Sequence, residues 1–573
     1  MTNTLPRLKR RQFVQGLAGA ALLPSVGVHP ARASAEPAWT GETLTGNDFD
    51  LTIAPRTVNL TGRQRTATAI NGSVPAPVLR WREGERVRLR VTNQLDATTS
   101  IHWHGIILPF RMDGVPEISY DGIQPGETFV YEFDVNQAGT YWYHSHSGFQ
   151  EQTGMYGALI IDPADEEPAP ADREHVLVLS DWTDEDPDSV YHNLKRQAHY
   201  YNYNQRTFFD LIADMRERGV VDTLQARHMW NTMRMSSRDL SDVTGSTYTF
   251  LLNGTPPAAN WTGLFRPGET VKLRVINASA MTFFDVRIPG LEMTVVAADG
   301  QPVKPVPVDE FRVGVAETYD VLVRPQDERA FTIFAQALDR SGYARGTLAP
   351  RAGMTAPVPE MDKRPERGME AMGSMQAMGD HSGMKMDHKG GGMNMEMEPA
   401  DHAEAEYGPS TAMRIDYPST RLDDPGVGLP VDGRRCLSYA DLEQRHAYPD
   451  QREPERELTL HLTGNMERYM WSFNGVEFSD AEPIRFRYGE RLRINLHNDT
   501  MMDHPIHLHG MWSDLETGDG RLARKHTVIV KPGERISYQV SADALGGWAY
   551  HCHLLYHMAA GMFREVRVEE GES

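Results

Sequence analysis

Alternation of polar and apolar residues recurs at three places along the chain and predicts β-strands there. The runs are GERVRLRVTN from Gly84, GETVKLRVIN from Gly268 and GERLRINLHN from Gly489. In each run a glycine precedes a stretch in which every second residue is apolar, which is the period of a strand with one buried face. A second predicted strand follows each run. The recurrence indicates several copies of one β-rich unit.

A second repeat supports the same interpretation. QPGETFVYEFDV from Gln124 matches KPGERISYQV from Lys531, and VAETYDVLV from Val315 is a weaker counterpart. Repeats of well over a hundred residues favour Greek-key β-sandwich domains over a short-repeat solenoid. The sequence therefore predicts an all-β fold with three domains at 44–165, 166–350 and 411–573.

Two segments have a different character. TFFDLIADMRERGVVDTLQARHMWNTM, within the second predicted domain, has helical periodicity and is predicted to be a helical insertion. Residues 351–410 are rich in Met, Gly, Asp and His and lack the apolar content of a core. They are predicted to form a flexible linker before the third domain.

The N-terminal residues predict export from the cytoplasm. Arg10 and Arg11 precede a short apolar stretch and an Ala-x-Ala pattern, which together indicate a signal peptide over 1–35. The paired arginines favour twin-arginine export and a periplasmic location. No other long apolar run occurs, so no transmembrane segment is expected in the mature chain. The net charge of −21 argues against a nucleic-acid partner, because phosphate backbones select basic surfaces.

Four His-x-His pairs stand at matching ends of the repeats in the first and third predicted domains. One such pair is expected by chance about once in a chain with this histidine content, so a single pair would be a weak signal. The pairs are His102/His104 (HWH), His144/His146 (HSH), His507/His509 (HLH) and His551/His553 (HCH). Four pairs at equivalent places indicate a metal cluster shared by the two domains.

The HCH pair also contains a cysteine whose side chain must point away from its neighbours. Residues i and i+2 of a strand share one face, so His551 and His553 face one way and Cys552 the other. A thiolate with two imidazoles and a weak axial thioether is typical of a blue-copper electron-transfer site. Cys552, His557 and Met562 supply three of these groups, and His504 can supply the fourth. One strand would then connect two metal sites through a few covalent bonds.

Residue differences at aligned positions of the repeats predict a single blue-copper site. Ser145, Gln150 and Met155 of the first domain align with Cys552, His557 and Met562 of the third. The corresponding places of the middle domain read FFDVRIPG and FAQALDRSG, with neither a histidine pair nor a thiolate. The middle domain is therefore predicted to hold no copper centre.

With these motifs the chain resembles the three-domain multicopper oxidases, over nearly all of its predicted mature length. The resemblance implies cupredoxin-like domains, four copper ions and reduction of dioxygen to two waters with electrons taken one at a time from a substrate. It implies type 1 copper at His504, Cys552, His557 and Met562 and type 2 copper at His102 and His507. It implies type 3 coppers at His104, His144 and His553 and at His146, His509 and His551. Asp113, in RMDGVP, looks like the family's acidic residue near the type 2 copper, either a proton relay or a plain turn aspartate.

The segment before the third domain bears on the substrate. Its part from 369 to 397 contains nine methionines and two histidines, namely Met369, Met372, Met375, Met378, His381, Met384, Met386, His388, Met393, Met395 and Met397. Thioether sulfur is soft and selects Cu(I), and the surrounding residues offer nothing apolar for methionine to pack against. This predicts additional Cu(I) binding. With this segment the chain resembles the copper-resistance protein A family, whose members are periplasmic oxidases of copper tolerance.

Three hypotheses for function follow. The first is oxidation of Cu(I), in company with other periplasmic copper-handling proteins. The second is a laccase-like oxidation of small phenols or catechols, with the methionine-rich segment as a lid. The third is a copper-sequestering protein without enzymatic activity, which the complete ligand set disfavours. Cys436, the only other cysteine, is predicted to be a free, partly buried small hydrophobic residue.

Overall fold

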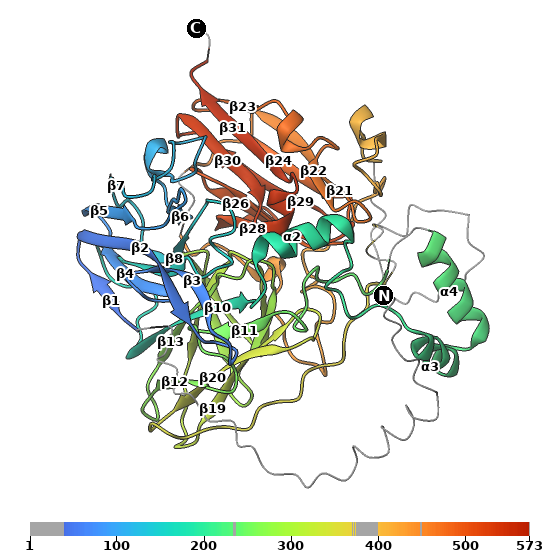
Figure 1. Cartoon of the computed structure of the whole chain (residues 1–573), viewed down its shortest axis with the longest axis horizontal. Coiled ribbons are helices and arrows are strands. Elements are labelled where there is room, and N and C mark those ends of the chain that lie inside the picture. The colour runs from blue at the N-terminus through green and yellow to red at the C-terminus, as the bar shows by residue number, and fades with distance from the viewer. Residues whose placement is uncertain are drawn as a thin grey trace, which may run out of the picture. The chain divides into compact units, whose positions relative to one another are not determined.

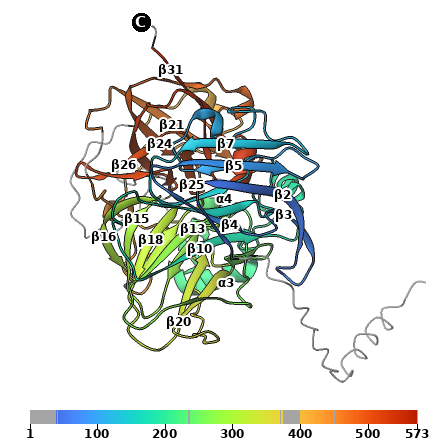
Figure 2. The same cartoon turned by 90° about the vertical axis from the view of Figure 1, so that its left-hand side faces the viewer.

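A computed structural model describes residues 39, 41–232, 236–368, 371, 373, 399–446 and 450–571. β-Strands make up most of its regular structure, as Figure 1 shows, and the prediction of an all-β fold is confirmed. The described strands form six sheets, and each sheet draws its strands from one of three stretches of the chain. Figure 2 shows the same strands after a quarter turn.

The first pair of sheets is built from residues 43–162. Its strands are β1 (Thr43–Thr45), β2 (Asp48–Val58), β3 (Arg65–Ile70), β4 (Ala76–Arg82), β5 (Arg86–Asn93), β6 (His102–His104), β7 (Thr128–Asp134), β8 (Gly139–His144) and β9 (Tyr156–Asp162). The sheet orders are β1-β4-β9-β8-β6 and β3-β2-β5-β7. On β5 the apolar residues Val87, Leu89 and Val91 are fully buried. The alternation seen in the sequence therefore places one face of this strand in the core.

The second pair of sheets is built from residues 173–349. Its strands are β10 (Arg173–Trp182), β11 (Thr249–Leu252), β12 (Trp261–Leu264), β13 (Val271–Asn277), β14 (Phe284–Arg287), β15 (Met293–Ala298), β16 (Gln301–Val308), β17 (Glu310–Val313), β18 (Thr318–Val323), β19 (Phe331–Ala337) and β20 (Tyr343–Ala349). The sheet orders are β11-β10-β13-β18-β15-β16 and β12-β20-β19-β14-β17.

The third pair of sheets, from residues 456–569, repeats this topology strand for strand. Its strands are β21 (Arg456–Asn465), β22 (Met470–Phe473), β23 (Ile484–Arg487), β24 (Arg491–Asn498), β25 (His504–Leu508), β26 (Ser513–Gly518), β27 (Arg521–Lys525), β28 (Thr527–Val530), β29 (Arg535–Ser541), β30 (Gly546–Cys552) and β31 (Phe563–Glu569). The sheet orders are β22-β21-β24-β29-β26-β27 and β23-β31-β30-β25-β28. The same strands pair in parallel in both copies, β10 with β13 and β21 with β24.

The first pair of sheets contains the same nucleus. Its order β3-β2-β5-β7 corresponds to β22-β21-β24-β29, and its order β4-β9-β8-β6 corresponds to β23-β31-β30-β25. The repeats read from the sequence thus reflect a shared topology. We propose each pair of sheets as one domain, with the boundaries given by the sequence.

Four α-helices are described, α2 (Pro187–Arg196), α3 (Phe208–Arg218), α4 (Val220–Thr232) and α5 (Leu555–Ala559). Helices α3 and α4 account for the helical insertion predicted in the second stretch. The Thr207 side chain accepts from the Asp210 N–H to begin α3, and Gly219, with φ 89°, separates α3 from α4. None of the described helices combines the length and the apolar content needed to cross a membrane.

The described parts of the predicted linker are held by ion pairs. Glu366 Oε1 accepts from Arg238 Nε at 2.8 Å, and Arg367 pairs with Asp503 with both side chains 5% exposed. On the other side of the segment, His402 donates to Glu406 at 2.8 Å. The described flanks of 351–410 are therefore fixed, and the predicted flexibility does not apply to them. Apart from Ala371 and Gly373, residues 369–398 lie outside the described residues.

Candidate metal centres

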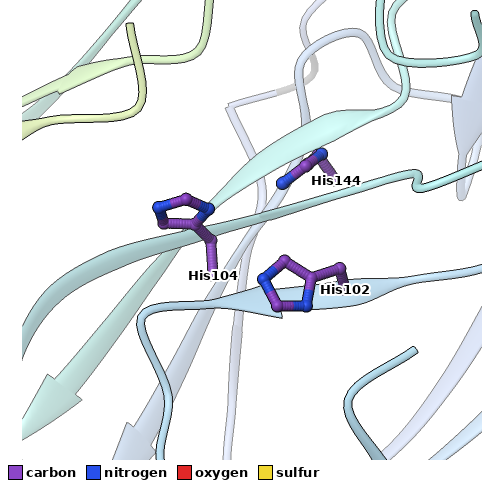
Figure 3. A group of neighbouring side chains, drawn as sticks. All are labelled: His102, His104 and His144. Carbon is purple, nitrogen blue, oxygen red and sulfur yellow. The ribbon is translucent and has the colours of Figure 1, made fainter. Parts of the chain in front are cut away.

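The four histidine pairs lie on, or within two residues after, equivalent strands of the first and third pairs of sheets. His102 and His104 are on β6, and its neighbour β8 ends at His144, with His102 opposite His144 in the antiparallel register. In the third pair, His507 on β25 lies opposite His551 on β30. Figure 3 shows His102, His104 and His144 grouped at the neighbouring ends of two strands. The repeated topology thus places the two histidine-bearing strands next to each other in both pairs of sheets.

All eight of these histidines come together in one cluster, in which His146 is partly exposed and the other seven are buried. His146 Nε2 lies 3.4 Å from His551 Nε2, and His509 Nε2 lies 3.1 Å from the same atom. His144 Nε2 lies 3.4 Å from His553 Nε2. The groups that can hold an ion include His102–His104–His144, His102–His507–His509 and His146–His509–His551. The cluster therefore joins the first and third pairs of sheets, as the sequence predicts.

Two of these imidazoles have one nitrogen fixed and one free. His102 Nδ1 lies 2.7 Å from the main-chain carbonyl of Asp113, and His507 Nδ1 lies 2.5 Å from that of His526. The Nε2 atoms of His102 and His507 have no hydrogen-bond partner among the described residues. A buried nitrogen without a partner is costly unless a ligand occupies the position. These two atoms are suited to a shared metal ion.

Burial keeps the cluster in its metal-binding form. It lowers the pKa of His104, His144 and His146 well below the usual 6.5, with smaller contributions from neighbouring imidazoles. The same cause lowers the pKa of His551 to about 4 and that of His553 well below 6.5. Neutral imidazoles are the form that binds metals.

The second predicted centre is on the opposite side of β30. Cys552 Sγ lies 3.5 Å from His504 Nδ1 and 3.9 Å from His557 Nδ1, and the two Nδ1 atoms are 3.3 Å apart. All three side chains are fully buried. Ligands bound at about 2.0 Å for nitrogen and 2.3 Å for sulfur lie about 3.3–3.7 Å from one another around a single ion. The donor set therefore fits one copper ion held by thiolate and imidazole.

Met562, the predicted axial ligand, lies beside this group. Its side chain is fully buried, and its main-chain carbonyl accepts from the Cys552 N–H at 3.1 Å. Its own N–H donates to the carbonyl of His557 at 3.1 Å. The chain therefore returns to Cys552 through Met562, after the short helix α5 that carries His557.

Both outer nitrogens of the Cys552 group are held by polar side chains. His504 Nε2 lies 2.7 Å from the Thr500 hydroxyl, and His557 Nε2 donates to Asp242 Oδ2 at 2.7 Å. Such partners orient the ring and tune the metal. Burial also raises the pKa of the Cys552 thiol, so binding of a metal must release its proton.

Asp113 is buried against the histidine cluster. Its Oδ2 accepts from His509 Nδ1 at 2.8 Å, and Oδ1 lies 3.4 Å from His102 Nδ1. Since its main-chain carbonyl also contacts His102, Asp113 holds two of the cluster's imidazoles. Its role as a proton relay stays a prediction.

Three further side chains contact the proposed ligands without being predicted from the sequence: the carboxylates of Glu151 and Asp242 and the imidazole of His526. Glu151 Oε2 lies 2.7 Å from His144 Nδ1, and burial raises its pKa well above 4.5. Asp242 contacts His557 from 315 residues away, and His526 Nδ1 lies 3.2 Å from His104 Nε2. None of them belongs to a repeated motif. Only the position of Glu151, a few residues after the HSH pair, could have indicated a role.

Cys436 is free and only partly buried, as predicted. Burial and the nearby carboxylates of Glu310 and Asp285 raise its pKa to about 12. Its thiol therefore stays protonated and has little tendency to bind metal.

Paired β-sandwich sheets, a thiolate–imidazole site and an imidazole cluster joined by one strand define a copper-dependent oxidoreductase. The chain belongs to the multicopper oxidases. Family models described as "Multicopper oxidase" match residues 52–166, 222–353 and 451–572. The family makes the chain an oxidoreductase with dioxygen as electron acceptor, and copper its cofactor.

Among curated proteins, the chain is 54% identical to "Copper resistance protein A" of Escherichia coli, covering 99% of this chain and 100% of that protein. It is 31% identical to "Multicopper oxidase MmcO" of Mycobacterium tuberculosis, over 91% of this chain and 86% of that protein. Among solved structures, the crystal structure of Fet3p, "a Multicopper Oxidase that Functions in Iron Import", matches with a TM-score of 0.64 and 21% identity. That match covers 92% of this chain and 91% of Fet3p, and it supports the fold.

Proposed function

We propose that the chain is a periplasmic copper-resistance oxidase that converts Cu(I) to Cu(II). Four Cu(I) ions would each give up one electron, and one dioxygen with four protons would become two waters. The product is less able to cross a membrane than Cu(I). The near full-length similarity to a copper resistance protein supports this role.

We propose that four copper ions occupy the ligand sets predicted from the sequence. Type 1 copper would bind at His504, Cys552, His557 and Met562, and type 2 copper at His102 and His507. The two type 3 coppers would bind at His104, His144 and His553 and at His146, His509 and His551. Bound copper supplies the one-electron chemistry. The free Nε2 atoms of His102 and His507 and the 3.1–3.4 Å approaches within the type 3 groups support this division.

The protein's own groups would serve electron and proton movement. Cys552 gives electrons a path of a few covalent bonds to His551 and His553. Asp113 lies against His509 at 2.8 Å, where it can pass protons to the cluster. Seven of the eight cluster histidines are buried and His146 is partly exposed, so bulk water is kept from most of the site.

One observation favours Cu(I) as the substrate: the chain enters the methionine-rich segment beside the type 1 site. Arg367 pairs with Asp503, which directly precedes His504. Ala371 packs in one buried cluster with Met413 and Met501. The methionines that follow would begin next to the type 1 ligands, where bound Cu(I) could deliver its electron.

Oxygen uptake tests this proposal. Steady-state uptake is measured with Cu(I) at controlled free concentration and with a catechol, using Cys552→Ser as a control that cannot turn over. A Cu(I) rate that saturates at low free copper and exceeds the catechol rate supports the proposal. Preference for the catechol would favour a laccase-like oxidase, and no uptake with either substrate would favour copper sequestration.

A further inference from the structure

Three more histidines meet in the third pair of sheets, outside the predicted copper ligands. His461 on β21 and His497 on β24 are neighbours in the parallel register of these strands. The ring centroid of His461 lies 4.8 Å from that of His497 and 4.8 Å from that of His402. For comparison, 5.0 Å separates the rings of His144 and His553 in the cluster. The three rings are therefore as close as imidazoles that are proposed to share an ion.

Two buried carboxylates hold two of these rings. Asp499 Oδ2 accepts from His461 Nδ1 at 2.7 Å, and Glu406 Oε2 accepts from His402 Nδ1 at 2.8 Å. The side chains of Asp499 and Glu406 are 0% and 1% exposed. Metal-binding histidines commonly donate their second nitrogen to a carboxylate in this way. The same arrangement is seen at His557, which donates to Asp242.

Main-chain amides fix the remaining oxygens of both carboxylates. The Ile415 N–H donates to Asp499 Oδ1 at 2.8 Å, and the Ala403 N–H donates to Glu406 Oε1 at 3.0 Å. Each carboxylate therefore keeps its second oxygen directed at a histidine. This arrangement is preorganised and involves three separate parts of the chain.

The outer nitrogens of the three rings are unpaired. His402 Nε2, His461 Nε2 and His497 Nδ1 are buried and make no hydrogen bond within the described residues. Asp416 Oδ1 is 3.5 Å from His402 Nε2, beyond a short hydrogen bond. The Nε2 atoms of His102 and His507, the proposed type 2 ligands, are in the same condition. Free nitrogens on three adjacent buried rings indicate a ligand that is shared among them.

The charges around the rings suit a divalent cation. Two buried carboxylates balance a charge of two. Burial, with the charges of His461 and Arg535, lowers the pKa of His497 to about 3, so this imidazole is neutral. Burial also opposes the charge on His461, but its hydrogen bond to Asp499 and the charges of Asp499 and Glu406 raise its pKa above 6.5. A metal would have to displace this proton.

We propose that His402, His461 and His497 form a further metal site, which takes Cu(II) and is held by Asp499 and Glu406. Imidazoles bind Cu(II) more tightly than other divalent first-row metals, whereas Cu(I) prefers thioethers. The site does not depend on the oxidase activity. Its role as the first resting place of the product does rest on the proposed function.

The position of the site fits that role. Asp499 is followed directly by Thr500, whose hydroxyl contacts His504 Nε2 of the proposed type 1 site at 2.7 Å. On its other side, Asp416 is 70% exposed and lies 3.5 Å from His402, so ions in solution have a short route to the site. His402 also follows the methionine-rich segment closely in sequence. When a Cu(I) ion is oxidised near His504, the resulting Cu(II) would be close to the imidazoles of this site, because Asp499 and Thr500 are adjacent in sequence and contact the two sites.

Copper counting tests the site in the full-length holoenzyme. Cu(II) is titrated into wild type and into His402→Gln, and bound copper is measured after removal of free ions, together with the electron paramagnetic resonance spectrum. Wild type should bind one Cu(II) more than the variant, with a tetragonal signal that shows coupling to imidazole nitrogens. The affinity of this ion should fall at least about tenfold in the variant. His175→Gln, a histidine of the second pair of sheets, is the matched control and should behave as wild type.

Two further measurements keep the result interpretable. The blue absorption and thermal midpoint report whether His402→Gln has folded, and the milder Glu406→Gln should weaken the same ion without removing a ligand. A variant lacking residues 374–397 removes seven of the nine methionines, His381 and His388 and should retain the extra Cu(II). Equal copper content and spectra in wild type and a folded His402→Gln, or an added signal without nitrogen coupling, would overturn the site.

The product role has a separate test. One equivalent of Cu(I) is given to holoenzyme in air, and the spectrum of the resulting Cu(II) is recorded. In wild type it should match the histidine-bound signal, and in His402→Gln it should match free Cu(II). If Cu(I) is not oxidised while titrated Cu(II) still depends on His402, the proposed function fails and the metal site stands.

Discussion

At Cys552 the two-residue period of a strand has a chemical consequence. Its thiol faces His504 and His557, whereas His551 and His553 face the imidazole cluster. The electron path between the two centres therefore depends on one side chain. Cys552→Ser should lose the intense blue absorption and all turnover, while the cluster still binds copper. Absorption spectra and copper content measure this, with Cys436→Ser as the matched control.

Retention of the blue band or of substrate oxidation by Cys552→Ser would show that the thiolate is elsewhere. Cys436 is the only other cysteine in the sequence, and its pKa of about 12 makes it a poor alternative.

Met562 is predicted to tune the same site. A weak axial thioether stabilises the oxidised metal, so its loss favours the reduced state. Met562→Leu should therefore keep the blue colour and raise the type 1 reduction potential in a redox titration. Met558→Leu, four residues earlier and partly buried, is the control. An unchanged potential in Met562→Leu and a raised one in Met558→Leu would exchange the roles of the two residues.

Asp242 should act on the same potential through His557. A carboxylate that accepts from His557 Nε2 makes the imidazole a better donor and favours the oxidised metal. Asp242→Asn should raise the potential while leaving the blue band in place. Tyr469→Phe removes the other hydrogen bond to Asp242 Oδ2, which is 2.8 Å long, so the carboxylate becomes a stronger acceptor from His557 and the potential should shift slightly in the opposite direction. A potential unaffected by Asp242→Asn would make Asp242 a packing residue only.

Most of the methionine-rich segment can be deleted without breaking the ion pairs that hold its flanks, although the linker bounds predicted from the sequence include those flanks. The predicted linker begins at 351, but Glu366 and Arg367 form ion pairs with Arg238 and Asp503. A deletion that includes them would break the contact next to His504. Deletion of 374–397 spares all of these pairs and removes seven of the nine methionines.

This deletion should leave the thermal midpoint and the blue band unchanged. Cu(I) oxidation at low free copper should fall through a higher apparent KM, and saturating copper should restore part of the rate, because the path through Cys552 remains. Oxidation of a small phenol should be unchanged or faster. Identical Cu(I) kinetics with and without the segment would argue against a role in collecting copper and favour a phenol oxidase.

The elements that the sequence predicts well are those that repeat. The runs from Gly268 and Gly489 fold into β13 and β24, which occupy the same place in two sheets of identical order. The eight paired histidines follow from that repetition. Glu151 does not, because the residue aligned with it in the third repeat is the apolar Met558. Asp242 does not, because it lies in the connection between α4 and β11 and reaches His557 only through tertiary packing. His402 was not predicted as a ligand either, because it lies in a segment predicted to be a linker and has no counterpart in another repeat.

At the scale of the whole molecule, the buried histidines predict how stability depends on pH. Their lowered pKa values mean that the folded apoprotein stays neutral there, while the unfolded chain binds protons below about pH 6.5. Each such histidine should therefore remove about 1.4 kcal/mol of unfolding free energy per pH unit below that value, down to its folded pKa. For His551 this window extends to about pH 4. Glu151, with its raised pKa, acts in the opposite direction, as do other buried carboxyls such as Glu310 and Glu534, but the histidines with lowered pKa values are more numerous.

Urea unfolding of the copper-free protein at pH 7.0 and 5.5 measures this effect, and the midpoint should fall at the lower pH. Glu151→Gln removes the opposing carboxylate and should make the fall steeper. A midpoint that does not change between the two pH values would show that the cluster is already protonated in the folded apoprotein.

The cluster draws its ligands from both ends of the chain, since His144 meets His553 across 409 residues and His146 meets His551 across 405. A ribosome must finish almost the whole chain before the last of these ligands exists. A nascent chain that has not reached His507 holds only His102, His104, His144 and His146, and a chain that stops before His551 cannot complete either of the proposed type 3 groups. Copper loading at this cluster is therefore a check that synthesis has passed His553, and a chain that fails the check cannot pass electrons to dioxygen.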